Sequence, residues 1–283
     1  MKIFDTVDAM RQVVAEARQA GKTVGFMPTL GGMHAGHFSL IEAARAECDV
    51  VVVSIFLNPT QFAPTEDLAA YPSTPEADHA ACEARGVDAI FTPSVEIMYP
   101  EGAATEALVP ALAKNLCGTN RPTHFAGVCT IVSKLFNIVP AHKAYFGAKD
   151  YQQAAIIRRM VMDLNVDIEI VVCPTVREVD GLAMSSRNAY LSAAERQQAP
   201  TLYRALQQGR EMILAGERDS AVVLSAMRNL LADGAPDGDI DYIQIVDPDT
   251  LDDVATCDPP VQVAVAVRFG GARLIDNIRA DEL

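Results

Sequence analysis

Short apolar runs alternate with helical patterns through the first two thirds of the chain, and this alternation constrains the fold more than any other feature. The runs predict strands at residues 23–27, 50–57, 89–92, 144–146 and 168–172. The segments between them predict helices at 7–20, 38–47, 76–85, 128–139 and 151–164. Several runs are apolar on both faces, as in strands that helices cover on both sides. The order predicts an α/β fold, a Rossmann-like doubly wound parallel sheet with ligands at the carboxyl ends of its strands.

The pattern changes after about residue 175. Two helical stretches, 193–215 and 220–232, precede two alternating runs at 242–246 and 261–267. Helices followed by alternating strands predict a second, smaller α+β domain. We therefore expect one domain over residues 1–175 and another over 176–283.

The charge balance limits the partners of the chain. Lys and Arg number 23 against 37 Asp and Glu, which gives a net charge of -14. A chain this acidic repels phosphate backbones, so nucleic acid is not expected as a main partner. Any anionic substrate must meet a local cluster of cations.

Cysteine spacing and hydropathy indicate the compartment. The six cysteines include no C-x-x-C pair and are expected to be reduced, mostly buried thiols of a cytoplasmic protein. No apolar run approaches 18 residues, and the N-terminus lacks the apolar region of a signal peptide, so no membrane association is expected.

The strongest local motif is PTLGGMHAGH at residues 28–37, between a predicted strand and a predicted helix. Gly31 and Gly32 allow backbone N–H groups to turn toward a ligand, and a helix N-terminus favours anions. His34 and His37 are three residues apart and would face the same way, which suits a polyphosphate. The alternative is a turn with two solvated histidines. The segment lacks the lysine of a Walker A loop and the G-x-G-x-x-G dinucleotide pattern.

A second candidate segment, FGAKDYQQ, follows the fourth predicted strand. Lys149 would lie at the same edge of the sheet as the histidines and bind a phosphate as a point charge. Asp150 would cap the next helix or bind a ribose hydroxyl, and Gln153 would reach the same pocket. A solvated lysine beside an N-cap aspartate is the structural alternative.

The segment DGLAMSSRN at residues 180–188 carries two hydroxyls and a guanidinium in a loop that begins with glycine. Ser185, Ser186 and Arg187 would form a second phosphate clamp that closes over a nucleotide. An N-cap or an ordinary loop explains the same residues.

Two further positions supply polar groups. Gln61 follows the second predicted strand and would bind a hydroxylated carboxylic acid, or serve as a turn amide. Asp78 would contact Mg²⁺ through substrate phosphates, or lie on a solvated helix surface.

Together these segments resemble the pantothenate synthetase (pantoate–β-alanine ligase) family of the nucleotidylyltransferase superfamily. The resemblance covers essentially the whole chain. It depends on PTLGGMHAGH, VVVSIFLNPTQF, EDLAAYPST, GVCTIVSKLFN, YFGAKDYQQ, DGLAMSSRNAYL and ARLIDN, in the order and spacing of the family.

The resemblance implies a reaction and its site residues. Pantoate and ATP would form pantoyl adenylate and pyrophosphate, and β-alanine would then displace AMP to give pantothenate. His37, His34 and Lys149 would be catalytic, and Gln61, Gln153 and Asn58 would bind the small substrates. Asp78 matches a carboxylate associated with Mg²⁺. The ATP site would comprise Leu30, Gly31, Gly32, Met33, His34, Ala35, Gly36, His37, Gly147, Ala148, Lys149, Asp150, Val176, Met184, Ser185, Ser186 and Arg187. The second domain is expected to close over this site, and family members are commonly homodimers.

The chain departs from the family pattern at four positions. Ser73 stands where the family usually has arginine and Ala126 where it often has arginine. Ala148 stands where the family usually has glutamate, and Ala77 where some members are acidic. These changes bear on magnesium and on loop support. Two alternatives stay open: a nucleotidylyltransferase that leaves AMP on its product, and a nonenzymatic ATP-binding protein.

Overall fold

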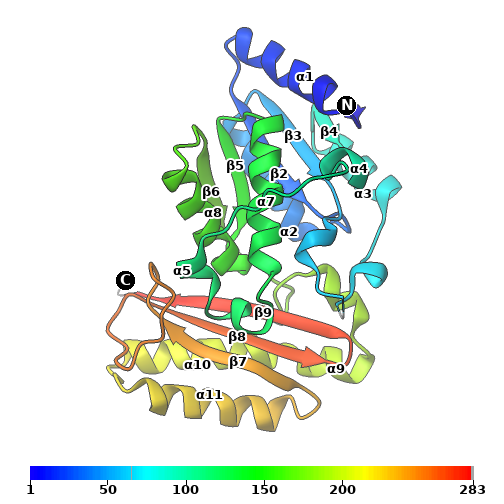
Figure 1. The fold of residues 1–283 in the computed structure, drawn as a ribbon. Coiled ribbons are helices and arrows are strands. Elements are labelled where there is room, and N and C mark those ends of the chain that lie inside the picture. The colour runs from blue at the N-terminus through cyan, green and yellow to red at the C-terminus, as the bar shows by residue number, and fades with distance from the viewer. Residues whose placement is uncertain (65, 282–283) are drawn as a thin grey trace. The chain divides into compact units, whose positions relative to one another are not determined.

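The computed structural model describes residues 1–64 and 66–281, which form two compact units (Figure 1). The first unit comprises Met1–Ala113, Arg121–Ala148 and Gln153–Pro174. The second comprises Lys114–Asn120, Lys149–Gln152 and Thr175–Leu283. Two short segments within the predicted first domain therefore group with the second unit, and one of them carries Lys149.

A six-stranded parallel sheet forms the centre of the first unit, in the order β1-β4-β3-β2-β5-β6. Its strands are β1 (Lys2–Phe4), β2 (Val24–Thr29), β3 (Val50–Ile55), β4 (Ala89–Phe91), β5 (Lys143–Gly147) and β6 (Glu169–Cys173). The predicted doubly wound α/β fold is confirmed, with β1 as an additional short edge strand.

Helices cover both faces of this sheet because its strands are apolar on both sides. The helices that accompany these strands along the chain are α1 (Val7–Gln19), α2 (Ala35–Glu47), α3 (Pro75–Ala84), α4 (Val95–Met98), α5 (Pro110–Ala113), α7 (His124–Ile138) and α8 (Tyr151–Asp163). Met27 of β2 belongs to a core cluster with Ile41 of α2. The neighbouring Phe26 makes an edge contact with Phe136 of α7, at 6.4 Å between ring centres. Successive residues of β2 thus enter two different cores.

The chain reverses its direction across the sheet at β2. From β2 it runs through β3 to β4 on one side, and β5 and β6 lie on the other. Pairing of β2 with β5 is confined to Gly25–Lys143 and Phe26–Ala144, although β2 continues to Thr29 and β5 to Gly147. Such a reversal point, at the carboxyl ends of the strands, is where open α/β sheets bind ligands.

The second unit has an antiparallel sheet of β7 (Asp239–Val246), β8 (Val261–Phe269) and β9 (Ala272–Ala280). The helices α10 (Thr201–Leu214) and α11 (Ser220–Gly234) cover one face of it (Figure 1). Two short helices, α6 (Cys117–Asn120) and α9 (Ala193–Gln198), complete the unit.

In the second unit one expectation was wrong and one strand was not predicted. The single helix expected at 193–215 is broken into α9 and α10, because Pro200 has no N–H to continue the helical hydrogen bonds. The strand β9 was not expected, since polar residues interrupt its apolar pattern.

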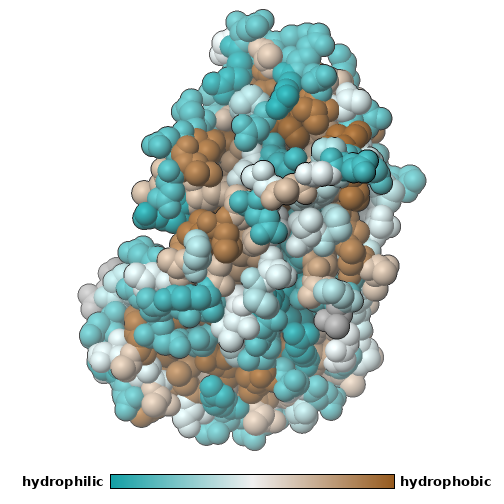
Figure 2. All heavy atoms as spheres, in the orientation of Figure 1, coloured by the Kyte–Doolittle hydropathy of each residue, from teal (hydrophilic) through white to brown (hydrophobic). Residues whose placement is uncertain are grey.

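On the face shown in Figure 2, hydrophilic residues separate the hydrophobic patches. Within the described residues, no helix is long and apolar enough to cross a membrane. All six cysteines are buried and unpaired, as predicted.

Candidate active site

Two histidines cap the N-terminus of α2. Nδ1 of His34 accepts a hydrogen bond from the N–H of Gly36 at 3.1 Å. Nδ1 of His37 accepts from the N–H of His34 at 3.3 Å, so the two side chains form a reciprocal capping box. The ring centres lie 4.2 Å apart. The helix therefore starts at Ala35, three residues before the predicted start.

This cap determines which nitrogen of each ring is protonated. In neutral imidazole one nitrogen accepts and the other donates. Because both Nδ1 atoms accept backbone N–H groups, both Nε2 atoms carry hydrogen. His34 and His37 thus present two N–H donors at a helix N-terminus, where backbone dipoles already favour an anion.

The glycine loop before the histidines is fixed from within the protein. Gly31 and Gly32 have φ values of 94° and 61°, in the left-handed region that favours glycine. The N–H of Gly31 donates to Oγ1 of Thr29 at 3.1 Å. The N–H groups of Gly32 and Met33 donate to the two carboxylate oxygens of Asp78, at 2.9 and 3.0 Å. The sequence predicts that the glycine N–H groups face a ligand, but the structure assigns them to side chains of the protein.

Asp78 itself is only 2% exposed. Its Oδ1 also accepts a hydrogen bond from the hydroxyl of Thr74 at 3.0 Å, so both oxygens are engaged. Its neighbour Ala77 provides no second carboxylate, and the described residues contain no group of three or more metal-ligating side chains. This donor set does not fit a magnesium ion held by the protein itself, and the contact of Asp78 with Mg²⁺ stays a prediction.

Replacing Asp78 by asparagine should destabilise the protein in the absence of magnesium. The new amide N–H₂ would face one backbone N–H of the loop and leave it unpaired, at a cost of about 1–3 kcal/mol. Urea denaturation of the magnesium-free protein measures the change. Glu76→Gln, on the exposed surface of the same helix, is the matched control. Unchanged stability of Asp78→Asn without magnesium would contradict the anchoring role.

An amide network orders the segment after β3. Asn58 is fully buried, and its Nδ2 donates to Oε1 of Gln61 at 3.1 Å and to the carbonyl of Gly127 at 3.2 Å. Its Oδ1 accepts from the hydroxyls of Tyr99 and Thr60, at 2.7 and 3.0 Å. Since Oε1 of Gln61 is an acceptor here, its Nε2 is the group left to donate to another partner. Asn58 thus fixes the orientation of the Gln61 side-chain amide.

Several further residues support Gln61. The backbone carbonyl oxygen of Gln61 lies 3.2 Å from Nη2 of Arg121 and 2.8 Å from Nδ1 of His124. Arg121 also forms an ion pair with Glu66. Burial acts to raise the pKa of Glu66, but hydrogen bonds from Arg121 and a backbone N–H outweigh it and hold the pKa below its usual value. Gly127 allows close packing, since a β-carbon there would lie 2.5 Å from the carbonyl oxygen of Thr60.

Lys149 lies in the short 3-10 helix η3 (Ala148–Asp150), directly after β5. Its side chain is 19% exposed, and its Nζ lies 3.9 Å from the carboxylate of Asp150. Its carbonyl oxygen accepts a hydrogen bond from Nδ2 of Asn277 at 2.8 Å. Gln153 is half-buried in the first turn of α8.

The predicted serine clamp follows a small hairpin of the second unit. The N–H of Met184 donates to the carbonyl of Val176 at 2.9 Å, which brings these two predicted ATP residues together. Ser185 caps the 3-10 helix η4 (Ser186–Tyr190) by accepting from the N–H of Arg187 at 3.3 Å. The interpretation of this motif as an N-cap is thus confirmed for Ser185. Ser185, Ser186 and Arg187 are all half-buried.

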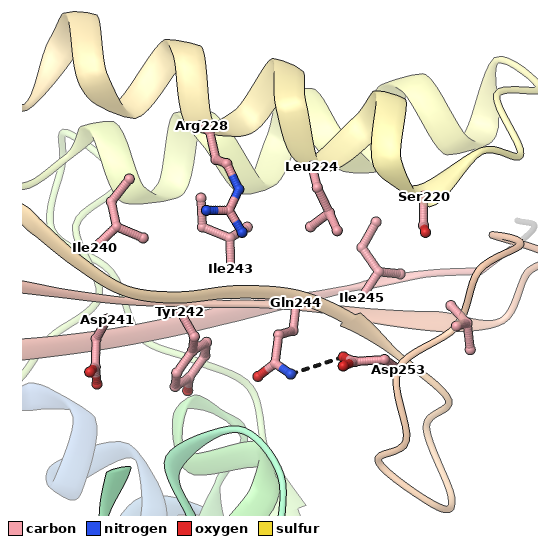
Figure 3. A pocket seen from close by; sticks show the side chains of 11 residues that line it. Ser220, Leu224, Arg228, Ile240, Asp241, Tyr242, Ile243, Gln244, Ile245 and Asp253 are labelled. Atoms are coloured by element: carbon pink, nitrogen blue, oxygen red, sulfur yellow. Dashed lines mark hydrogen bonds between the residues drawn. The ribbon is translucent and has the colours of Figure 1, made fainter. Parts of the chain in front are cut away.

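A hollow of about 430 Å³ lies between α11 and β7 of the second unit. Figure 3 shows Leu224 and Arg228 of α11 directed toward the face of β7 from which Ile243 and Ile245 point. Its lining includes none of the predicted site residues. This hollow is therefore not the candidate active site.

A parallel sheet with a reversal point at β2, followed by two histidines that cap the next helix, is the arrangement of a nucleotide-binding α/β enzyme. A family profile described as Pantoate-beta-alanine ligase matches residues 2–279. The chain belongs to the pantoate–β-alanine ligase family. The predicted family, fold class and ligase activity are thereby confirmed.

Individual relatives agree with this assignment. Pantothenate synthetase of Thermotoga petrophila is 53% identical over 98% of this chain and 99% of the relative. That of Moorella thermoacetica is 52% identical over 98% of each chain. A crystal structure of pantothenate synthetase from Thermus thermophilus covers both chains fully, at 45% identity and a TM-score of 0.94. The Francisella tularensis ligase, in complex with a form of ATP and β-alanine, aligns over 99% of this chain and 98% of its own, at 32% identity and a TM-score of 0.81.

Proposed function

We propose that the histidine pair and the amide network of the first unit perform the adenylation half of the pantoate–β-alanine ligase reaction. In this step a carboxylate oxygen of (R)-pantoate attacks the α-phosphorus of ATP. The bond from that phosphorus to the oxygen bridging to the β-phosphate breaks, and pyrophosphate leaves. Charge builds on the departing phosphates, so fixed donors that face them lower the barrier.

The orientation of the two imidazoles carries this proposal. The capping bonds at Nδ1 leave Nε2–H of His34 and His37 as donors at the N-terminus of α2. Donors whose orientation is already fixed need no reorganisation when charge develops on the phosphates. His37 would act as the acid toward the leaving group, with His34 beside it.

Gln61 would bind pantoate. Its Nε2 would donate to the carboxylate or a hydroxyl of the acid while Asn58 holds its Oε1. Asn58 would then contribute to pantoate binding indirectly, by orienting Gln61. Gln153 would be the second amide side chain that binds pantoate. Binding of this kind holds the carboxylate near the α-phosphorus and reduces the entropic cost of their encounter.

We assign the remaining phosphate contacts to the second unit by the resemblance. Lys149 and Arg187 would supply positive charge, and Ser185 and Ser186 hydroxyl donors. Magnesium would arrive with ATP as its phosphate-bound complex, in which the protein contributes few direct ligands. In the second half-reaction the amine of β-alanine attacks the acyl carbon of the adenylate and loses a proton, and AMP leaves.

A coupled assay of AMP and pyrophosphate tests the function. With ATP and magnesium, the purified protein should form both products only when pantoate is present, and pantothenate once β-alanine is added. Turnover without pantoate, or a final product that keeps AMP, would contradict the proposal and favour a simple nucleotidylyltransferase. No turnover at all would favour an ATP-binding protein without this chemistry.

The resemblance also supports a homodimer and residence in the cytoplasm, and six unpaired cysteines suit a reducing compartment. Light scattering of the purified protein measures the oligomeric state.

A further inference from the structure

Two adjacent residues of β9 bind the two segments of the second unit that carry predicted ATP residues. Asp276 is 4% exposed and accepts hydrogen bonds from Nη1 and Nη2 of Arg177, at 2.6 and 3.0 Å. Asn277 donates from Nδ2 to the carbonyl oxygen of Lys149 at 2.8 Å. The same stretch of strand thus bonds to the segment of Lys149 and to the hairpin before the serine clamp.

Arg177 transmits the position of Asp276 to the hairpin. Its Nη1 also donates to the carbonyl of Gly181 at 3.1 Å, and its guanidinium lies 3.7 Å from the ring centre of Tyr203. It pairs with Ala183 across the hairpin. Burial acts to raise the pKa of Asp276, and the bonds and charge of Arg177 act in the opposite direction. Because the planar guanidinium is held by the carboxylate of Asp276 and by the ring of Tyr203, the hairpin has little conformational freedom.

A hydrogen bond to its Oδ1 fixes the orientation of the Asn277 side-chain amide. Nε2 of Gln262, on β8, donates to Oδ1 of Asn277 at 2.8 Å. The remaining end of the amide, Nδ2, must then face the carbonyl of Lys149. Gln262 is 1% exposed, so this relay is shielded from competing water.

We propose that Asp276 and Asn277 are positioning residues for ATP, which hold Lys149 and the Ser185–Arg187 segment in their binding arrangement. The proposal rests on the ATP-binding roles given above. Neither residue need touch ATP itself. Binding groups misplaced by about 1 Å lose up to about 100-fold in rate, which makes such support kinetically visible.

Three variants test this proposal. Asp276→Asn removes the counter-charge of Arg177, and Asn277→Asp sets a carboxylate against the carbonyl of Lys149 while keeping an acceptor for Gln262. The matched control is Asp241→Asn. Asp241 is another aspartate of the sheet, with a side chain 10% exposed and paired with Arg273 at 2.6 Å, so this control also removes one negative charge from an ion pair.

We expect Asp276→Asn and Asn277→Asp to raise both KM for ATP and the calorimetric Kd for ATP by about 10-fold, and to lower kcat by about 10- to 100-fold. The control should lose thermal stability but keep KM for ATP. If all three variants change Tm alone, or if Asp241→Asn weakens ATP binding equally, the proposal is wrong. Absence of pantoate-dependent AMP from the wild-type protein would instead refute the proposed function. Asn277→Asp keeps the test decisive if Asp276→Asn fails to fold.

Discussion

Replacing His37 by alanine should lower the rate of pantoate-dependent pyrophosphate release by about 10²- to 10³-fold. The substitution removes the Nε2–H that we assign to the departing phosphates. It also removes Nδ1, which accepts the N–H of His34 in the helix cap. Rapid-quench measurement of pyrophosphate in the first turnover isolates this step from the reaction with β-alanine.

His37→Asn separates catalysis from helix capping. The amide oxygen of asparagine can take the place of Nδ1 as acceptor, but nothing replaces Nε2. We expect the asparagine variant to keep the wild-type Tm and to be as slow as the alanine variant. Turnover near the wild-type rate in either variant would remove His37 from the chemistry.

Replacing Lys149 by alanine should lower kcat/KM for ATP by about 100-fold, because a positive charge would be lost from the phosphates. Lys149→Arg should recover only part of this loss, since a planar fork does not reproduce a compact ammonium. Steady-state kinetics with varied ATP measure the effect, and circular dichroism checks the fold.

Lys143, in the strand that precedes Lys149, provides the control for Lys149. Lys143 lies at the amino end of β5, where its Nζ binds the carboxylate of Glu47 at 2.7 Å. Lys143→Ala removes the same charge from the opposite end of the strand and should leave kcat/KM for ATP near the wild-type value. Equal losses in the two variants would indicate a general effect of charge rather than a phosphate contact.

Local sequence signals were sufficient for the sheet of the first unit and for the loops that leave it. Apolar runs mark β2, β3 and β5, and glycine, histidine and lysine follow two of these strands directly. A polar motif that directly follows a buried parallel strand lies at the carboxyl end of that strand. The sequence alone therefore predicts on which edge of the sheet the motif lies. The same local logic failed for β9, whose buried Asp276 resembles a surface residue until its partner Arg177 is known.

Long-range contacts explain what the sequence could not predict. Asp78 lies 46 residues from Gly32, and Asn277 lies 128 residues from Lys149. On its own helix Asp78 resembles a solvated carboxylate, and only tertiary packing places it under the glycine loop. Likewise Asn58 follows a strand like a substrate-binding residue, yet residues distant in the sequence, Tyr99 and Gly127, bind its Oδ1 and its Nδ2.

The early end of pairing between β2 and β5 has a consequence for how the enzyme tolerates variation. The pairing ends after Phe26 and Ala144, while the backbones of both strands continue beyond these residues. Substitutions at the strand ends are therefore expected to change the charge and the length of the side chains near the ligand, and to leave the separation of the two strands in place. Ala148 follows β5 at a position where the family resemblance implies glutamate, and alanine carries no charge there.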